Sequence, residues 1–186
     1  MIRVDADLSN SSADAKVSVA YQRLHNPNGL GHGTGKEILM TSAASGQLYL
    51  VDAVAEGRPG EMMRITDTVR MDSSVDNPSF FSDAYANSTH DASGIVLAGL
   101  SKAVHVMKLK KDIKTPLGVV VWLVKKDEEG EWVKKILFED DGSRISSASA
   151  AVVLPIDPAR EGGRKKAWLW ITGFVSESAI AVKVDL

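Results

Sequence analysis

The chain has 186 residues, of which 44% are hydrophobic and 25% charged, and it contains no cysteine. This composition is typical of a globular protein, and the absence of cysteine excludes disulfides, a thiolate nucleophile and cysteine-ligated zinc. The net charge of -2 gives no reason to expect a nucleic-acid partner, and no apolar run is long enough to predict a transmembrane segment.

The first part of the chain differs in composition from the rest. Residues 5–16 are rich in Asp, Ser and Asn, so residues 1–16 are predicted to form a flexible polar lead-in. From residue 17 onward, short apolar runs are separated by turn residues, which predicts a single all-β domain over residues 17–186. The clearest hairpin joins residues 118–124 to 131–138 through an acidic turn that ends in glycine.

Three segments share one layout: residues 37–52, 94–109 and 167–186. Each has a short apolar strand, a turn of small residues and a returning strand with alternating pattern. Hairpins that recur with loops of different length favour a β-propeller, in which each blade buries its face on the next. A β-sandwich, in which hairpins also recur, is the alternative.

Two loops carry candidate ligands for a metal ion. Residues 25–36 are rich in glycine but match neither nucleotide-binding pattern, and a strand follows them rather than a helix. Here Asn28 is predicted to lie in a tight Asn-Gly turn, with its amide oxygen free to face a cation. In the second loop, Asp76 and Asn77 offer two adjacent oxygen ligands of the kind that calcium prefers. An ordinary turn is the alternative at each place.

Several familiar hydrolase patterns are missing from the sequence. There is no GxSxG, so the chain has no nucleophile elbow of the α/β-hydrolase type. The four histidines show neither HxH nor HExxH spacing, which leaves a zinc site unsupported.

Taken in order, four motifs resemble the paraoxonase/arylesterase family of calcium-dependent esterases. The motifs are Asn28-Gly29-Leu30 with the strand return Leu48-Tyr49-Leu50-Val51, then Val75-Asp76-Asn77, then Val96-Leu97-Ala98-Gly99, and the closing hairpin from Ile171 to Leu186. That family folds as a six-bladed β-propeller related to strictosidine synthases and gluconolactonases. The resemblance covers residues 17–186 and implies about three blades, the C-terminal half of such a propeller.

The resemblance also implies a function. Asn28, Asp76 and Asn77 would ligate the catalytic calcium, and Phe174, Val175 and Ser176 would line the substrate pocket. In this family the ion polarises a carbonyl or phosphoryl oxygen, so the implied substrates are esters, lactones or organophosphates.

The chain lacks several residues on which the family's activity depends. The family takes further calcium ligands and its histidine base from its first half, and three side-chain ligands are too few for calcium, which takes about 6–8 oxygens. We therefore expect a truncated chain, or one that pairs with a second chain or a missing N-terminal half to complete the propeller. The main alternative is a non-catalytic propeller fragment that acts as a binding or scaffold module. A condensation of the strictosidine synthase type is a third reading.

Overall fold

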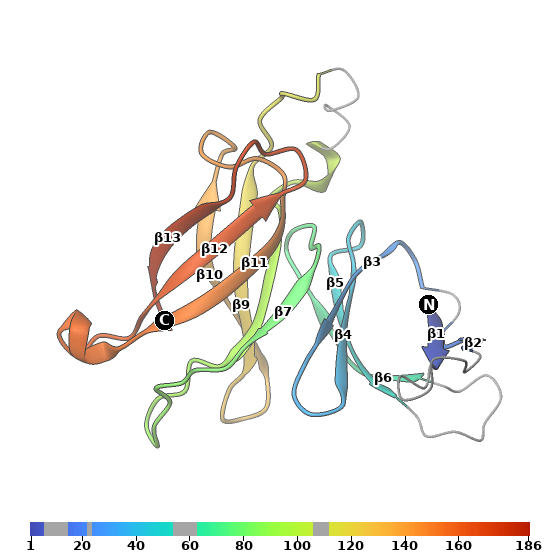
Figure 1. Cartoon of the computed structure of the whole chain (residues 1–186), viewed down its shortest axis with the longest axis horizontal. Helices are drawn as coiled ribbons and strands as arrows, with labels where there is room; N and C mark the ends of the chain where they lie inside the picture. The colour runs from blue at the N-terminus through green and yellow to red at the C-terminus, as the bar shows by residue number, and fades with distance from the viewer. Residues whose placement is uncertain (6–14, 22–23, 54–62, 106–111) are drawn as a thin grey trace.

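The computed structural model describes residues 1–5, 15–21, 24–53, 63–105 and 112–186. The predicted all-β class is confirmed, since the described residues form four antiparallel sheets. Figure 1 shows three larger sheets side by side in chain order, from blue through green and yellow to red. Within the described residues, no helix has the length and apolar character needed to cross a membrane.

The first large sheet is a simple meander of four strands in the order β3-β4-β5-β6. Its strands are β3 (Pro27–His32), β4 (Glu37–Ser42), β5 (Gln47–Ala53) and β6 (Met63–Arg70). The hairpin predicted over residues 37–52 is confirmed, with Glu37 opposite Asp52 and Ser42 opposite Gln47. Gly46 closes its turn at φ 59°, in the left-handed region that favours glycine.

The second large sheet is another four-stranded meander, and it forms the middle layer. Its strands are β7 (Pro78–Phe81), β8 (Gly94–Leu100), β9 (Val119–Lys126) and β10 (Trp132–Asp140). The predicted hairpin of residues 118–124 with 131–138 is confirmed as β9 and β10.

The hairpin predicted over residues 94–109 is wrong. Its first strand, β8, pairs with β7 and β9, while residues 103–105 form a 3-10 turn and residues 106–109 lie outside the described residues. The physical reason is burial: every residue of β8 is buried. A strand covered on both faces pairs best with another continuous apolar run, and β9 supplies one.

The third large sheet has three strands, one fewer than the other two. It contains β11 (Ala148–Ile156), β12 (Lys166–Gly173) and β13 (Ile180–Asp185), in that order. The hairpin predicted over residues 167–186 is confirmed as β12 and β13. The 3-10 helix η2 (Pro158–Glu161) lies between β11 and β12, and the Asp157 side chain caps it.

A small fourth sheet lies at the start of the chain. Strand β1 (Ile2–Asp5) pairs with β2 (Lys16–Val19), placing Ile2 opposite Val19 and Val4 opposite Val17. Residues 2–5, which the sequence assigned to a flexible lead-in, are therefore in a strand. The polar stretch that suggested flexibility begins only at residue 5, and the alternating apolar residues before it can pair.

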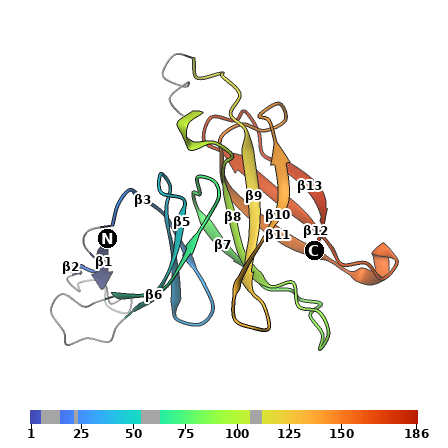
Figure 2. The same cartoon turned by 180° about the vertical axis from the view of Figure 1, so that it is seen from behind.

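The three large sheets pack face to face through two apolar layers. Leu39, Leu48 and Leu50 of the first sheet belong to one core cluster with Leu97 and Trp122 of the second. The opposite face of the second sheet packs against the third sheet in another core cluster. Its members include Val96, Ala98, Val121, Val153, Leu169 and Ile171. Strand β7 contacts both β3 and β11, so the first strands of the three sheets lie next to one another (Figure 2).

Candidate functional site

The segment that leads into β7 passes between two strands at glycine positions. A Cβ atom on Gly29 of β3 would lie 2.6 Å from the Cα of Asn77 and 2.8 Å from the carbonyl oxygen of Asp76. On the other side, a Cβ on Gly99 of β8 would lie 1.9 Å from the carbonyl oxygen of Ser74. Only residues without a Cβ permit such close backbone approach, so these two glycines allow the 74–77 segment to lie against both strands.

Asn28 lies in a strand, and the prediction of a tight Asn-Gly turn is wrong. Both Asn28 and Gly29 belong to β3, and the turn to β4 is made by residues 33–36. The β3–β4 pairing is irregular here: Pro27 is opposite Ser42 and Leu30 is opposite Met40. Two residues of β3 thus face one residue of β4, which is a β-bulge, and bulges often redirect a side chain.

Backbone hydrogen bonds hold Asp76 and Asn77 to the two neighbouring sheets. The Asp76 N–H donates to the carbonyl of Ala98 at 2.8 Å, and the Asn77 N–H donates to the carbonyl of Ser149 in β11 at 2.9 Å. The Asn77 side-chain amide donates to the same Ser149 oxygen at 3.0 Å. This pair of residues therefore joins the second and third sheets, as well as approaching β3.

Asn28 and Asp76 line one cavity of about 380 Å³. Ser74 adds a third polar side chain, and the rest of the lining is Ala43, Ala44, Gly99, Leu100, Ala103, Ala148 and Phe174. The structure thus brings together two of the three predicted ligands and one predicted pocket residue. Asn77 is adjacent to Asp76 but does not line this cavity, because its amide is turned to Ser149.

The carboxylate of Asp76 is partly buried and has no partner: no hydrogen bond or ion pair to it occurs among the described residues. Burial raises the pKa of Asp76 above the usual carboxyl value. A carboxylate that has lost part of its hydration without gaining a hydrogen-bond donor is stabilised when it takes up a proton or binds a cation. The Asp76 carboxylate and the Asn28 amide oxygen are hard ligands, which suit calcium better than zinc or copper.

The number of such ligands is small. Across the part of the chain that the structure describes, no group of three or more His, Cys, Asp and Glu side chains could hold a metal ion. The donor types around Asp76 therefore fit a calcium-type cation, while their number fits only part of its shell.

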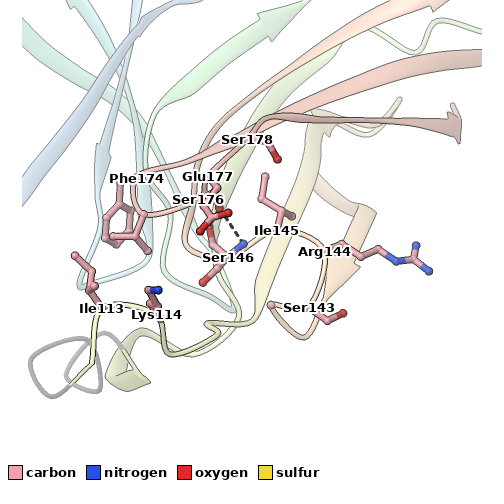
Figure 3. A pocket seen from close by; sticks show the side chains of 12 residues that line it. Ile113, Lys114, Ser143, Arg144, Ile145, Ser146, Phe174, Ser176, Glu177 and Ser178 are labelled. Atoms are coloured by element: carbon pink, nitrogen blue, oxygen red, sulfur yellow. Dashed lines mark hydrogen bonds between the residues drawn. The ribbon is translucent and has the colours of Figure 1, made fainter.

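The remaining predicted pocket residues line a second cavity of about 540 Å³, which the β12–β13 connection forms together with residues 113–114 and 142–146. Figure 3 shows the Phe174 ring beside Ile113, and Ser176 bonded to Ser146. The Ser176 hydroxyl accepts from the Ser146 N–H at 3.0 Å and donates to the Ser146 carbonyl at 2.6 Å. Val175 also lines this cavity, and Phe174 lines both cavities, so its side chain stands between them.

Sequence reasoning missed Ser74 and the small residues of the cavity wall. Ser74 had a usable signal, because residues two apart in an extended segment point to the same side, and it precedes Asp76 by two. Ala43 and Ala148 had none, since small apolar residues are common in any strand or turn.

Comparison with known proteins adds no relative. No protein-family model matches the chain, and a search of curated proteins finds no match either. The geometry of the Asn28–Asp76 cavity and the short motifs of the sequence are therefore what a function has to be argued from.

Proposed function

We propose that the chain carries part of the cation site of a calcium-dependent hydrolase similar to the paraoxonase/arylesterase family. One observation carries the proposal: Asn28 of β3 and Asp76 of the segment before β7 are far apart in the sequence, yet they line one cavity, and the partly buried Asp76 carboxylate has no partner among the described residues. Calcium bound there would polarise a carbonyl or phosphoryl oxygen and stabilise the oxyanion that develops on it. Esters, lactones and organophosphates are the corresponding substrates.

The chain's own residues have distinct parts in this proposal. Asp76 and Asn28 hold the cation, while Asn77, which was predicted as a third ligand, fastens the segment beside them to β11 through its bonds to Ser149. The apolar part of the wall receives the uncharged part of the substrate. Among the described residues, Asp76 is the only charged side chain in the lining, which suits a neutral ester or lactone.

We further propose that the three large sheets are consecutive blades of a β-propeller. Support comes from their repeated meander order, their face-to-face packing and the contacts of β7 with β3 and β11. The remaining calcium ligands and the general base would then come from blades on a second chain or another polypeptide segment.

The outer face of the third sheet supports this completion of a ring. Four large apolar side chains on that face are about half exposed: Val152 at 50%, Leu154 at 51%, Trp168 at 43% and Trp170 at 49%. They are neighbours, because Val152 pairs with Trp170 and Leu154 with Trp168. Exposed apolar patches of this kind mark interaction sites, and a further sheet would cover this one as the described sheets cover each other.

Calcium titration of the purified chain tests the site. We expect heat of binding by isothermal calorimetry in the wild type and its loss in Asp76→Asn. The matched control is Asp72→Asn, which removes an exposed carboxylate four residues away that pairs with Lys134 at 2.6 Å. Equal calcium binding by wild type and Asp76→Asn would contradict the proposed site.

Hydrolysis of phenyl acetate tests the reaction. We expect weak activity at most from this chain alone, since its calcium shell is incomplete, and loss of that activity on addition of a chelator. Calcium binding without hydrolysis, even when the ring is completed by a partner, would favour the binding-module alternative. Full activity from the isolated chain would refute the claim that ligands and base come from elsewhere.

A further inference from the structure

Thr41 lies opposite the β-bulge that carries Asn28 and is completely buried. Its hydroxyl accepts a hydrogen bond from the Gly29 N–H at 2.9 Å. The same oxygen lies 2.6 Å from the carbonyl oxygen of Asp76 and 3.5 Å from that of Gly29. A hydroxyl has one proton to donate, and the shorter distance assigns that proton to Asp76.

This hydroxyl supplies partners that regular pairing does not. The bulge leaves Asn28 and Gly29 without a regular register with β4. Asp76 lies in the segment that precedes β7, where its N–H bonds to Ala98 and its carbonyl points to Thr41. The Thr41 side chain therefore bonds Gly29, which is next to the candidate ligand Asn28, and also the backbone of the candidate ligand Asp76.

We propose that Thr41 is a positioning residue that sets the separation of Asn28 from Asp76 across the cavity. The inference depends on the proposed function for what the two side chains hold, but the bridge itself depends only on the described contacts. Thr41 touches neither the cavity nor a substrate, and it acts through the backbone of Gly29 and Asp76. Because the Thr41 hydroxyl and the Gly29 N–H are both buried, water cannot easily replace the hydroxyl as the partner of that N–H.

Two substitutions separate the hydroxyl from the shape of the side chain. Thr41→Val keeps the volume and removes the hydroxyl, while Thr41→Ser keeps the hydroxyl and removes a methyl group. The matched control is Ser42→Ala, since the Ser42 hydroxyl is also completely buried but donates to the carbonyl of His25 at 2.5 Å. Ser42 bonds neither Gly29 nor Asp76, so its loss is structural only.

The first measurement needs no metal. Amide hydrogen exchange by NMR reports protection of the Gly29 N–H, and the Asn28 side-chain amide resonances report its position. We expect loss of Gly29 protection and shifted Asn28 resonances in Thr41→Val, with wild-type behaviour in Thr41→Ser and Ser42→Ala. Unchanged Gly29 protection in Thr41→Val would overturn the inference. If Thr41→Val does not fold, protection of the Gly29 N–H is measured in Thr41→Ala instead, and unchanged protection there would overturn the inference.

The second measurement is calcium affinity by calorimetry. Residues that orient metal ligands typically change metal affinity by about 10–100-fold when substituted. We expect a loss of about tenfold or more in Thr41→Val, recovery in Thr41→Ser, and no loss in Ser42→Ala. Wild-type affinity in a folded Thr41→Val chain would overturn the positioning role. Absence of calcium binding in the wild type would instead refute the proposed function, and the exchange measurement would still decide the role of Thr41.

Discussion

Gly29→Ala is the most direct perturbation of the backbone approach that forms the cavity. The added Cβ would lie 2.6 Å from the Cα of Asn77, whereas ordinary van der Waals contact begins at 3.4 Å, so β3 has to move away by about 0.8 Å. Its other close neighbours are the Asp76 carbonyl oxygen and the Pro78 ring, each at 2.8 Å. These atoms are parts of the backbone or of a rigid ring, and they cannot rotate aside.

The expected cost follows from that geometry. Overpacking of a well-packed region costs about 1–3 kcal/mol, so the urea midpoint of Gly29→Ala should fall accordingly. A misplacement near 1 Å at a reacting centre costs on the order of a hundredfold, and the movement here separates Asn28 from Asp76. We therefore expect calcium affinity to fall by about tenfold or more, measured by calorimetry on the folded variant.

A control separates the close approach from the general effect of replacing glycine. Gly130 has φ +86° and no atom within 4 Å of a Cβ added there. Gly130→Ala should therefore cost about 1 kcal/mol through backbone strain alone and leave calcium affinity unchanged. The reasoning is refuted if Gly29→Ala keeps both the stability and the calcium affinity of the wild type, or if Gly130→Ala weakens binding as much.

Three further predictions concern charge and exposed surface. The buried Asp83 carboxylate lies 2.8 Å from the Lys165 ammonium, and although burial alone would raise its pKa, the lysine and nearby N–H donors lower it. Stability from the depressed pKa is present above the unfolded pKa and lost as pH falls through the folded one. Lys165→Met should thus cost about 3 kcal/mol in urea melts at pH 7 and progressively less in acid. For Asp76 the sign is opposite: its raised pKa means that the charged form is penalised, so Asp76→Asn should raise the urea midpoint at neutral pH without calcium. That gain should vanish below about pH 4, where the unfolded chain is protonated as well. Replacing Trp168 and Trp170 by serine should reduce both the fluorescence of a bound apolar dye and concentration-dependent association in light scattering, while the circular dichroism spectrum is retained.

Much of the fold follows from the periodicity of the sequence, and the exceptions have local causes. The β9–β10 and β12–β13 hairpins combine alternating strands with short turns, so the pairing partner is the next run along the chain. The sequence of strand β8 does not indicate its pairing partner, because a run that is apolar on both faces can pair equally well with any apolar strand. Its true neighbour, β9, begins beyond a long connection, and the choice between near and distant partners is made by burial.

The candidate site, like the fold, could be predicted from the sequence only in part. The sequence identifies Asn28 and Asp76 as possible hard oxygen ligands and shows the segment of Asp76 as an interruption between strands, whereas Asn28 lies inside β3. That they would share a cavity depends on how closely β3 approaches the segment before β7, and this distance is set by the missing Cβ of Gly29 and by the hydroxyl of Thr41. Neither residue stands out in a sequence, since glycine usually indicates a turn and threonine usually indicates a strand. A search for cation sites in β-proteins of this kind should therefore examine glycines inside strands that pack against the segment leading into another sheet. Close backbone approach at Gly29 is what brings Asn28 of β3 near Asp76 of the segment before β7.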